Sequence, residues 1–237
     1  MDSGIIIDVE TTGLNSESDK IIELGYLEFV FEGDSKPAIV ETYGGLEDPG
    51  VSISDEITKI TGISNSHVKD RKIDWSRLRS AMERAEIVIA HNADFDKGFV
   101  MRRPELAGLT VHWGCSLRHV DWTSKGFKSH ALNYLAADNG FVNPFAHRAV
   151  FDCATTFRLV APYLNELVER SYEREYKVLA KGAPFESKDV LKQNGYKWDP
   201  ALRVWHKTMG EKKLELEREF LLKNVYHGSS THEEVKL

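Results

Sequence analysis

The sequence predicts an α/β protein in which helices flank a mixed five-stranded sheet, followed by a small α+β module. The first 170 residues alternate short β-branched runs with segments of helical periodicity. Strands come first, and later strands alternate with helices, which is typical of a mixed sheet. The character of the chain then changes to basic, turn-rich and aromatic. We therefore expect one domain over 1–170 and a module with a polar tail over 171–237.

Five segments of the first domain are predicted as strands because they are short, apolar and rich in β-branched residues. The first, IIIDV, is broken by Thr11-Thr12-Gly13, and the second and third form a meander joined at 32–35. The fourth, IVIA, is purely apolar. The expected strands are 5–9, 20–31, 37–44, 87–90 and 111–115.

Five further segments are predicted as helices from their periodicity and end signals. Ser54 or Asp55 could cap the first, Gly62 ends it, and Pro104 stops the third. The expected helices are 55–61, 75–85, about 95–103, 130–138 and 149–169. Helical spacing predicts an apolar face from Leu78, Met82 and Ala85 in the second helix and from Ala154, Phe157, Ala161 and Leu164 in the last.

The module is predicted to contain a strand, a short helix, a hairpin around Asp199-Pro200, a charged helix over 211–223 and a polar tail from His227. Residues 170–237 carry 14 Lys and Arg against 11 Asp and Glu, whereas residues 1–169 carry 17 against 26. An acidic domain joined to a basic one suggests that chemistry and binding are divided between them.

Composition excludes several classes of protein. No run approaches 18 apolar residues, so no membrane span is expected. Met1-Asp2-Ser3-Gly4 leads directly into a strand, so we expect no secretory signal. Cys115 and Cys153 lie outside any metal-ligand spacing, which favours a reducing, cytoplasmic setting. The net charge of −6 argues mildly against a nucleic-acid partner, but the basic module offsets that argument.

Two carboxylates at the end of the first strand indicate a metal site. Asp8 and Glu10 are two residues apart on a strand, so their side chains project from the same face. Such a pair would repel, and one member would be protonated, unless a cation intervened. Oxygen ligands without a cysteine or histidine pair favour Mg²⁺ or Mn²⁺ over zinc. This spacing alone is a weak signal, because charged residues alternate at many strand edges.

Further polar residues strengthen that signal. Asp96 comes shortly after an apolar strand, at the start of a helix. His147 comes five residues before Asp152, where the longest helix begins. Carboxylates with a neighbouring histidine provide metal ligands and a general base.

Three motifs, IIIDVETTGL, AHNADFDKGF and FAHRAVFDCATT, resemble those of the DEDD exonuclease superfamily in its histidine subclass. The resemblance covers roughly residues 4–165, in the order and spacing of bacterial proofreading subunits, exonuclease X and ribonuclease T. GISNSHVKD and SHALNYLA resemble the connecting segments of that family. The resemblance implies a ribonuclease H-like fold.

The resemblance also implies roles for five residues and two cations, Mg²⁺ or Mn²⁺. Asp8, Glu10 and Asp152 would hold the cation that binds the attacking water. Asp8 would share the second cation, with Asp96 helping through water. His147 would deprotonate the water that attacks the terminal phosphodiester.

Substrate contacts are expected beside these residues. Thr11 and Thr12 would meet the 3′-terminal nucleotide through backbone and hydroxyl groups. Leu14 and Phe95 would contact its base or sugar, although Phe95 could equally be a core residue. Asp94 is expected to be solvated or to cap its helix, and His91 to support the site from below.

The module carries lysines interleaved with aromatic residues, a combination that suits single-stranded nucleic acid. Lys188, Lys192 and Lys197 are the expected phosphate contacts. The alternative is that the aromatic residues Phe185, Tyr196, Trp198 and Trp205 form the core of a small module. Its segment FESKDVLKQNGYKWDPALRVWHK resembles a small module appended to varied nucleic-acid enzymes.

The sequence therefore predicts a 3′→5′ exonuclease that releases nucleoside 5′-monophosphates from single-stranded 3′ ends, with DNA preferred over RNA. Repair, recombination or mismatch trimming is expected, since proofreading would require a separate polymerase partner. The alternatives are an exoribonuclease, because metal-assisted chemistry at the phosphate does not distinguish the sugar, and a catalytically silent nucleic-acid-binding protein.

Overall fold

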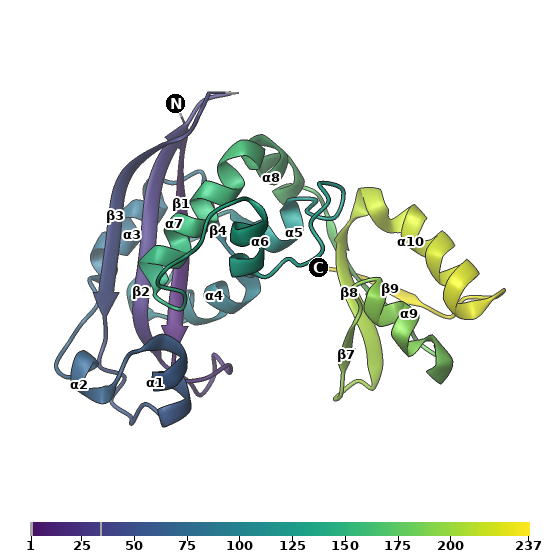
Figure 1. Ribbon diagram of the computed structural model, residues 1–237, viewed down its shortest axis with the longest axis horizontal. Helices are drawn as coiled ribbons and strands as arrows, with labels where there is room; N and C mark the ends of the chain where they lie inside the picture. Colours follow the sequence, from purple (N-terminus) through teal and green to yellow (C-terminus); the bar gives the residue numbers. More distant parts are fainter. Residues whose placement is uncertain (1, 34) are drawn as a thin grey trace. The chain divides into compact units, whose positions relative to one another are not determined.

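The computed structural model describes residues 2–33 and 35–237, and it divides the chain after Ser171 into two compact units. Each unit has its own sheet and its own apolar core. Figure 1 shows the elements of both. None of the helices in the described part of the chain is both long and apolar enough to cross a membrane.

The described residues of the first unit contain a five-stranded sheet in the order β3-β2-β1-β4-β5. Strand β1 pairs antiparallel with β2 and parallel with β4, so the predicted mixed five-stranded sheet is confirmed. The strands are β1 (Asp2–Thr11), β2 (Ile21–Phe31), β3 (Ala38–Leu46), β4 (Ile87–Ala90) and β5 (Trp113–Cys115).

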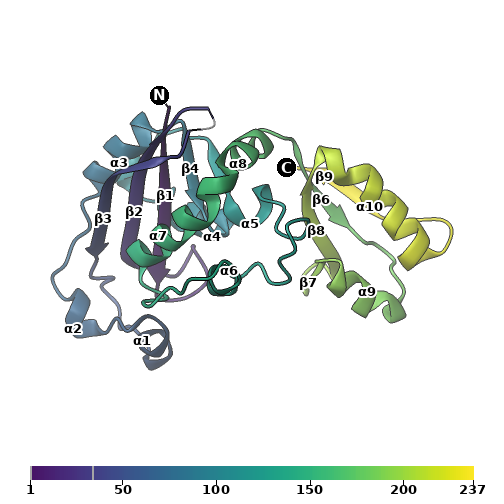
Figure 2. The same ribbon diagram turned by 45° about the horizontal axis from the view of Figure 1, so that its top comes forward.

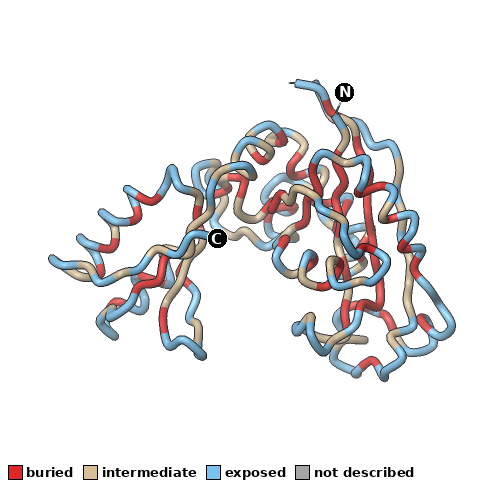
Figure 3. The backbone as a smooth tube through the Cα atoms, turned by 180° about the vertical axis from the view of Figure 1, so that it is seen from behind, coloured by how far each residue is buried: buried red, intermediate tan, exposed pale blue. Residues whose placement is uncertain are grey.

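Apolar side chains on both faces of β1 explain why it lies inside the sheet. Ile5 and Ile7 pack with Leu78 on one face, whereas Ile6 packs with Leu27 and Leu159 on the other. All of these except Leu159 are completely buried. A strand covered on both faces carries consecutive apolar residues, as Ile5-Ile6-Ile7 does. Figure 3 shows the buried backbone concentrated along these strands.

The helices of the first unit cover both faces of this sheet, and α7 runs across the face formed by β1 and β2 (Figure 2). Ser54 caps α1 by accepting a hydrogen bond from the N–H of Ile57, and Gly62 ends it at a φ of 72°. The helices are α1 (Asp55–Thr61), α2 (Asn65–Val68), α3 (Trp75–Arg84), α4 (Ala93–Val100), η1 (Pro104–Leu106), α5 (Ser116–His119), α6 (Leu132–Asp138), α7 (Ala149–Val160), η2 (Ala161–Tyr163) and α8 (Leu164–Ser171).

The prediction of one continuous helix over 149–169 was wrong. The chain forms α7, a 3₁₀ turn and α8, because Pro162 lacks an N–H and its ring disfavours a straight α-helix. The expected apolar face was correct only in part: Leu164 is buried and Phe157 packs against the core. Ala154 is exposed, and the buried side of α7 carries Cys153, Thr156 and Val160.

The described residues of the second unit form a four-stranded antiparallel sheet in the order β7-β8-β6-β9. Its last strand corrects a prediction, because the expected polar tail contains β9, which pairs with β6. The elements are β6 (Glu175–Leu179), η3 (Phe185–Ser187), α9 (Lys188–Gln193), β7 (Lys197–Asp199), β8 (Val204–Gly210), η4 (Glu211–Lys213), α10 (Leu214–Leu221), the π-helical turn η5 (Leu222–Tyr226) and β9 (Glu233–Lys236).

Candidate active site

Three carboxylates from two distant segments meet at the end of β1. Among the residues that the structure describes, Asp8, Glu10 and Asp152 each place a carboxylate oxygen within 4.8 Å of the others. Asp8 and Glu10 come from β1, and Asp152 lies in the first turn of α7. An all-oxygen donor set of this kind fits a hard divalent cation.

Gly25 allows α7 to begin this close to the carboxylates. It lies on β2 directly opposite Asp8. A Cβ atom at Gly25 would lie 2.4 Å from both the carbonyl carbon of Ala149 and the amide nitrogen of Val150. Only a residue without a side chain therefore permits the approach that brings Asp152 to β1.

Asp96 is the fourth carboxylate, and it lies outside the three-residue group. It is 2 % exposed in the first turn of α4, and its Oδ1 accepts a hydrogen bond of 3.0 Å from the backbone N–H of Val9. This bond fastens α4 to β1 between Asp8 and Glu10. The negative charge of Asp96 is close enough to Asp8 to raise the pKa of the Asp8 carboxyl group.

Burial raises the pKa of each of the four carboxyl groups, and repulsion between carboxylates adds to the shift in Asp8, Glu10 and Asp96. Burial raises the pKa of Glu10 and of Asp96 to about 8, and neighbouring carboxylates add to both shifts. It also raises the pKa of Asp8 well above its usual range. The pKa of Asp152 rises only to about 6, because His147 and two backbone N–H groups favour its charged form. A divalent cation would remove the repulsion and allow all four to ionise.

This electrostatic arrangement predicts that, without a cation, the protein loses stability as the pH rises from about 4 to about 8. In that window the folded protein retains protons on Glu10 and Asp96 that the unfolded chain has released, so the free energy of unfolding falls with pH. Thermal unfolding in EDTA at several pH values measures this slope. Added Mg²⁺ should raise the melting temperature most at the alkaline end. A metal-free melting temperature that stays constant across the window would contradict the arrangement.

Glu23 and Arg148 fix the start of α7 beside the site. The Glu23 side chain is 5 % exposed and accepts hydrogen bonds of 2.9–3.2 Å from the Arg148 guanidinium. It also accepts the backbone N–H of Ala149 at 3.0 Å. The backbone N–H of Arg148 donates to Oδ2 of Asp152 at 3.1 Å. Arg148 therefore holds a site carboxylate and a buried glutamate at once.

His147, which directly precedes Arg148, has a strained backbone conformation. Its φ is 61°, in the left-handed region that residues other than glycine rarely adopt. Its side chain is exposed, and its interaction with Asp152 lowers the pKa of that carboxyl group. The hydrogen bonds of Arg148 and Ala149 to Glu23 hold the backbone immediately after His147.

Replacing Glu23 with glutamine is expected to reduce kcat about 10- to 100-fold, because a small displacement of a catalytic group costs this much. The amide has no charge and only one accepting oxygen, so it cannot accept both from the Arg148 guanidinium and from the N–H of Ala149 as the carboxylate does, and the start of α7 should loosen. Steady-state kinetics, with thermal unfolding alongside, provide the measurement. Glu28→Gln is the matched control, since Glu28 is also buried on β2 and pairs with Arg84 instead. Equal activity losses in the two variants would show a general effect of destabilisation.

Sequence reasoning missed Glu23 and Asn143. Asn143 donates from Nδ2 to Oδ1 of Asp152 at 2.8 Å, so both oxygens of Asp152 are held. The signal for Glu23 was an acidic residue inside a strand that is otherwise almost continuously buried, since such an acid needs a partner. Asn143 gave no local signal.

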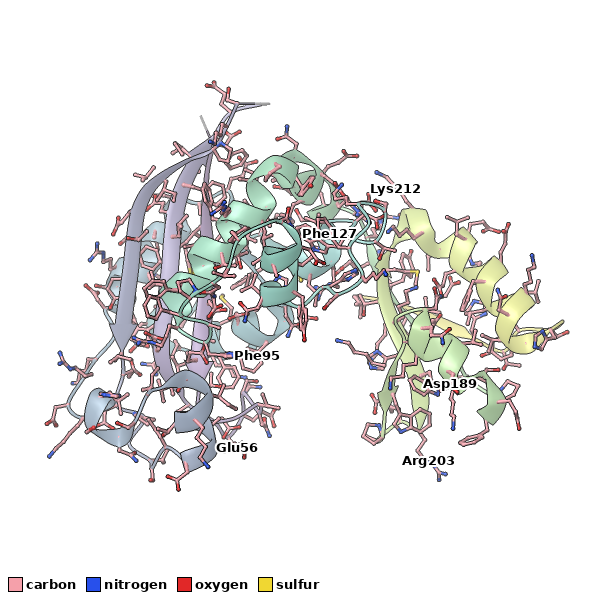
Figure 4. The ribbon with its side chains drawn as sticks, viewed as in Figure 1. Glu56, Phe95, Phe127, Asp189, Arg203 and Lys212 are labelled. Carbon is pink, nitrogen blue, oxygen red and sulfur yellow. The ribbon has the colours of Figure 1, made fainter. Side chains whose placement is uncertain are left out.

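The four residues expected to contact the terminal nucleotide of the substrate differ in exposure and in their hydrogen bonds. The Thr11 hydroxyl bonds the carbonyl of Gly13, and the Thr12 hydroxyl accepts the N–H of Lys20 at 3.0 Å, so both hydroxyls stabilise the turn after β1. Leu14 extends into solvent and is 87 % exposed. Phe95 of α4 (Figure 4) is partly buried, and its ring centroid lies 5.0 Å from that of Phe99.

Two neighbouring residues have structural partners. Asp94 is exposed and pairs with Arg118 at 2.8 Å. The His91 ring lies between the Ser116 hydroxyl, at 2.7 Å, and the carbonyl of His130, at 2.9 Å. Burial lowers the pKa of His91 to about 4, so this ring is neutral at pH 7.

The three predicted module lysines lie on the second unit. Lys188 and Lys192 are exposed on α9, and Lys197 is exposed on β7. The sequence left open whether the aromatic residues of the module form its core or are exposed to nucleic acid, and the structure shows some of each. Tyr196 belongs to the core and Trp205 packs against it, whereas Phe185 and Trp198 are exposed.

Comparison with known proteins places the first unit in a family. The RNase T family model, described as exonuclease, matches residues 5–160. The chain is 32% identical over 169 residues to the PolC-type DNA polymerase III of Caldanaerobacter subterraneus subsp. tengcongensis, covering 70% of this chain and 12% of that protein. It is 31% identical over 169 residues to the corresponding polymerase of Listeria innocua, covering 69% and 11%. The chain thus spans about an eighth of the length of these relatives.

Solved structures share the fold. Exonuclease X in complex with 5′ overhanging duplex DNA is 23% identical with a TM-score of 0.51, over 68% of this chain and 91% of that one. Escherichia coli exonuclease I in complex with a dT13 oligonucleotide is 14% identical with a TM-score of 0.63, over 94% and 70%. The predicted ribonuclease H-like fold is therefore confirmed. With the family model covering the segments that carry all four carboxylates, the chain belongs to the exonuclease family of the DEDD superfamily.

Proposed function

We propose that this protein is a metal-dependent 3′→5′ exonuclease that hydrolyses DNA from single-stranded 3′ ends and releases nucleoside 5′-monophosphates. The observation that carries the proposal is the meeting of Asp8, Glu10 and Asp152 within 4.8 Å in a chain of the exonuclease family. DNA is favoured over RNA because the polymerase relatives are DNA polymerases and both structural neighbours are DNA complexes.

The donor set suits two divalent cations, Mg²⁺ or Mn²⁺. Asp8, Glu10 and Asp152 would hold one, and Asp8 with Asp96 would hold the other. When bound, such cations lower the pKa of a coordinated water and neutralise charge that develops on the phosphate.

The protein's own residues supply positioning and proton transfer. A ring nitrogen of His147 would accept the proton of the attacking water, since this exposed imidazole adjoins the carboxylates. Asn143 and the backbone of Arg148 hold Asp152 in one orientation. Leu14 and Phe95 would contact the terminal base or sugar. Backbone groups of Thr11 and Thr12 would contact the same nucleotide, because their hydroxyls serve the turn.

A polarity assay tests the proposal. Matched single- and double-stranded DNA and RNA oligonucleotides, each labelled at the 5′ end, are incubated with Mg²⁺, with Mn²⁺ and with EDTA. Stepwise shortening of the labelled strand, with 5′-mononucleotides as product, is expected for single-stranded DNA and only with metal. Faster shortening of RNA would establish the exoribonuclease alternative. Binding without cleavage in every metal would establish a catalytically silent protein.

The proposed role is in DNA repair or recombination. Proofreading is the second candidate, favoured by the similarity to polymerases, and it would require a separate polymerase as partner. A duplex with a mismatched 3′ terminus is added to the assay and compared with a fully paired duplex. Faster shortening of the mismatched end would show a preference for unpaired termini, and equal rates would show that pairing at the terminus does not matter.

A further inference from the structure

Phe185 and Trp198 of the second unit lie outside its core. That core consists of the buried residues Val178, Ala180, Leu191, Tyr196, Met209, Leu214, Leu221 and Val225. Phe185 is 76 % exposed and Trp198 is 48 % exposed. The edge strand β7 presents Trp198, whose ring packs at a steep angle against Trp205 with centroids 5.6 Å apart. The ring is thus supported from within and open to a ligand.

Cations that form no ion pair with a described residue lie on the same elements or beside them. Lys188, Lys192, Lys197 and Arg203 are exposed, and within residues 2–33 and 35–237 none of them forms an ion pair. Lys188 and Lys192 are four residues apart, so they share one side of α9. Arg203 extends from the turn between β7 and β8 (Figure 4). The Lys188 ammonium lies 4.6 Å from the centroid of the Phe185 ring.

Several acidic residues elsewhere in the unit have cationic partners. Glu217 pairs with Lys207, Glu173 with Lys212, and both Glu215 and Glu234 with Arg218. On the hairpin, Asp199 accepts the backbone N–H groups of Ala201 and Leu202. Lys188 and Lys192 on α9 balance Glu186 and Asp189 beside them, whereas the β7–β8 hairpin carries Lys197, Arg203 and Lys207 against Asp199, so the excess positive charge lies on the hairpin.

We infer that single-stranded nucleic acid binds along α9 and the edge strand β7. Phe185, Lys188, Lys192 and Trp198 are exposed there, and Lys197 projects from the other face of the same edge strand. These five residues are called here the stacking surface. Unpaired bases stack on the two rings, and lysines contact phosphates. Single strands fit because stacking requires bases that are free of a partner strand, and every base has a face to stack. The inference rests on the proposed function, because the strand bound here is proposed to be the one that the first unit shortens.

Binding is tested in the full chain carrying Asp8→Ala, in EDTA, so that no cleavage occurs. The probe is a long oligothymidylate labelled at its 5′ end, and the readout is fluorescence anisotropy. Adding Trp198→Ala should weaken binding about 5- to 100-fold, the effect of one lost stacking contact. Changing Lys188, Lys192 and Lys197 together to alanine should lower the slope of log K against log salt by about 2.

Matched controls separate stacking and charge from folding. Trp198→Phe keeps an aromatic ring and should retain most of the affinity. Lys223→Ala with Lys236→Ala removes exposed lysines from η5 and from β9, at the opposite edge of the sheet from β7. This control should leave binding unchanged. The lysine variants should unfold at the parental temperature, because their side chains lie outside the core. Trp198→Ala also removes the ring contact with Trp205, so its binding is measured at a temperature at which thermal unfolding shows it to be folded.

A substrate too small to reach the stacking surface tests the exonuclease activity separately from binding by that surface. With the catalytic residues intact, the stacking-surface variants should hydrolyse the p-nitrophenyl ester of thymidine 5′-monophosphate at the parental rate, yet require more oligothymidylate for half-maximal shortening. Oligothymidylate affinity unchanged by Trp198→Ala and by the triple lysine variant overturns the inference. A parent that binds oligothymidylate through this surface but hydrolyses neither substrate overturns the proposed function alone.

Discussion

Replacing Asp8 with asparagine is expected to lower the rate of phosphodiester hydrolysis by at least about 10³-fold. Asp8 is the carboxylate proposed to hold both cations, and asparagine keeps its size while removing its charge. Loss of several kcal/mol of transition-state stabilisation corresponds to about 10³-fold, since each 1.4 kcal/mol is about tenfold. Initial rates on a labelled single strand, across a range of Mn²⁺ concentrations, provide the measurement.

The same variant should be more stable than the parent in EDTA at alkaline pH. Asp8 contributes to a buried repulsive cluster, so removing its charge relieves the other carboxylates. Loss of activity with a raised melting temperature cannot come from misfolding. Asp94→Asn is the matched control, because Asp94 is exposed and its carboxylate pairs with Arg118. Full activity in Asp8→Asn, or activity that persists in EDTA, would refute the metal-dependent mechanism.

Much of the fold follows from local patterns. The short β-branched run of IIIDV and the purely apolar run of IVIA predicted the two strands that pair in parallel at the centre of the sheet. Ser54 and Gly62 correctly marked the ends of α1. Pro162 lay inside the predicted long helix, and giving it more weight would have placed the break between α7 and α8.

Strand β9 could not be predicted from its own residues. Glu233-Glu234-Val235-Lys236 has almost no apolar character, and it becomes a strand only because β6 offers an unpaired edge. Such pairing depends on tertiary context and leaves no local pattern.

The candidate site shows the same division between local and distant information. Spacing on a strand placed Asp8 and Glu10 on one face, and the helix start at Ala149 placed Asp152 in a first turn. The contact between Glu23 and Arg148 joins residues 125 apart, and Gly25 matters only because α7 crosses β2 there. Neither contact has a signature within a short window, so a single sequence could not reveal them.

Replacing His147 with glycine is expected to lower kcat by about 10²- to 10⁴-fold, the contribution of a positioned general base. The KM for oligonucleotide and the concentration of Mn²⁺ for half-maximal rate should change little, because the carboxylates remain. Glycine is chosen because the φ of 61° at this position suits it without strain, so the backbone should keep its path into α7. Added imidazole should restore part of the rate by entering the vacated space.

His147→Asn then separates proton transfer from backbone geometry. Asparagine tolerates the left-handed conformation better than most residues but cannot accept a proton at neutral pH. If His147 acts as the base, the asparagine variant should be as slow as the glycine variant. If the residue serves only to turn the chain into α7, both variants should approach the parental rate. Because Arg148 and Ala149 remain bonded to Glu23 in either case, equal and large losses in kcat would assign the proton transfer to the imidazole itself.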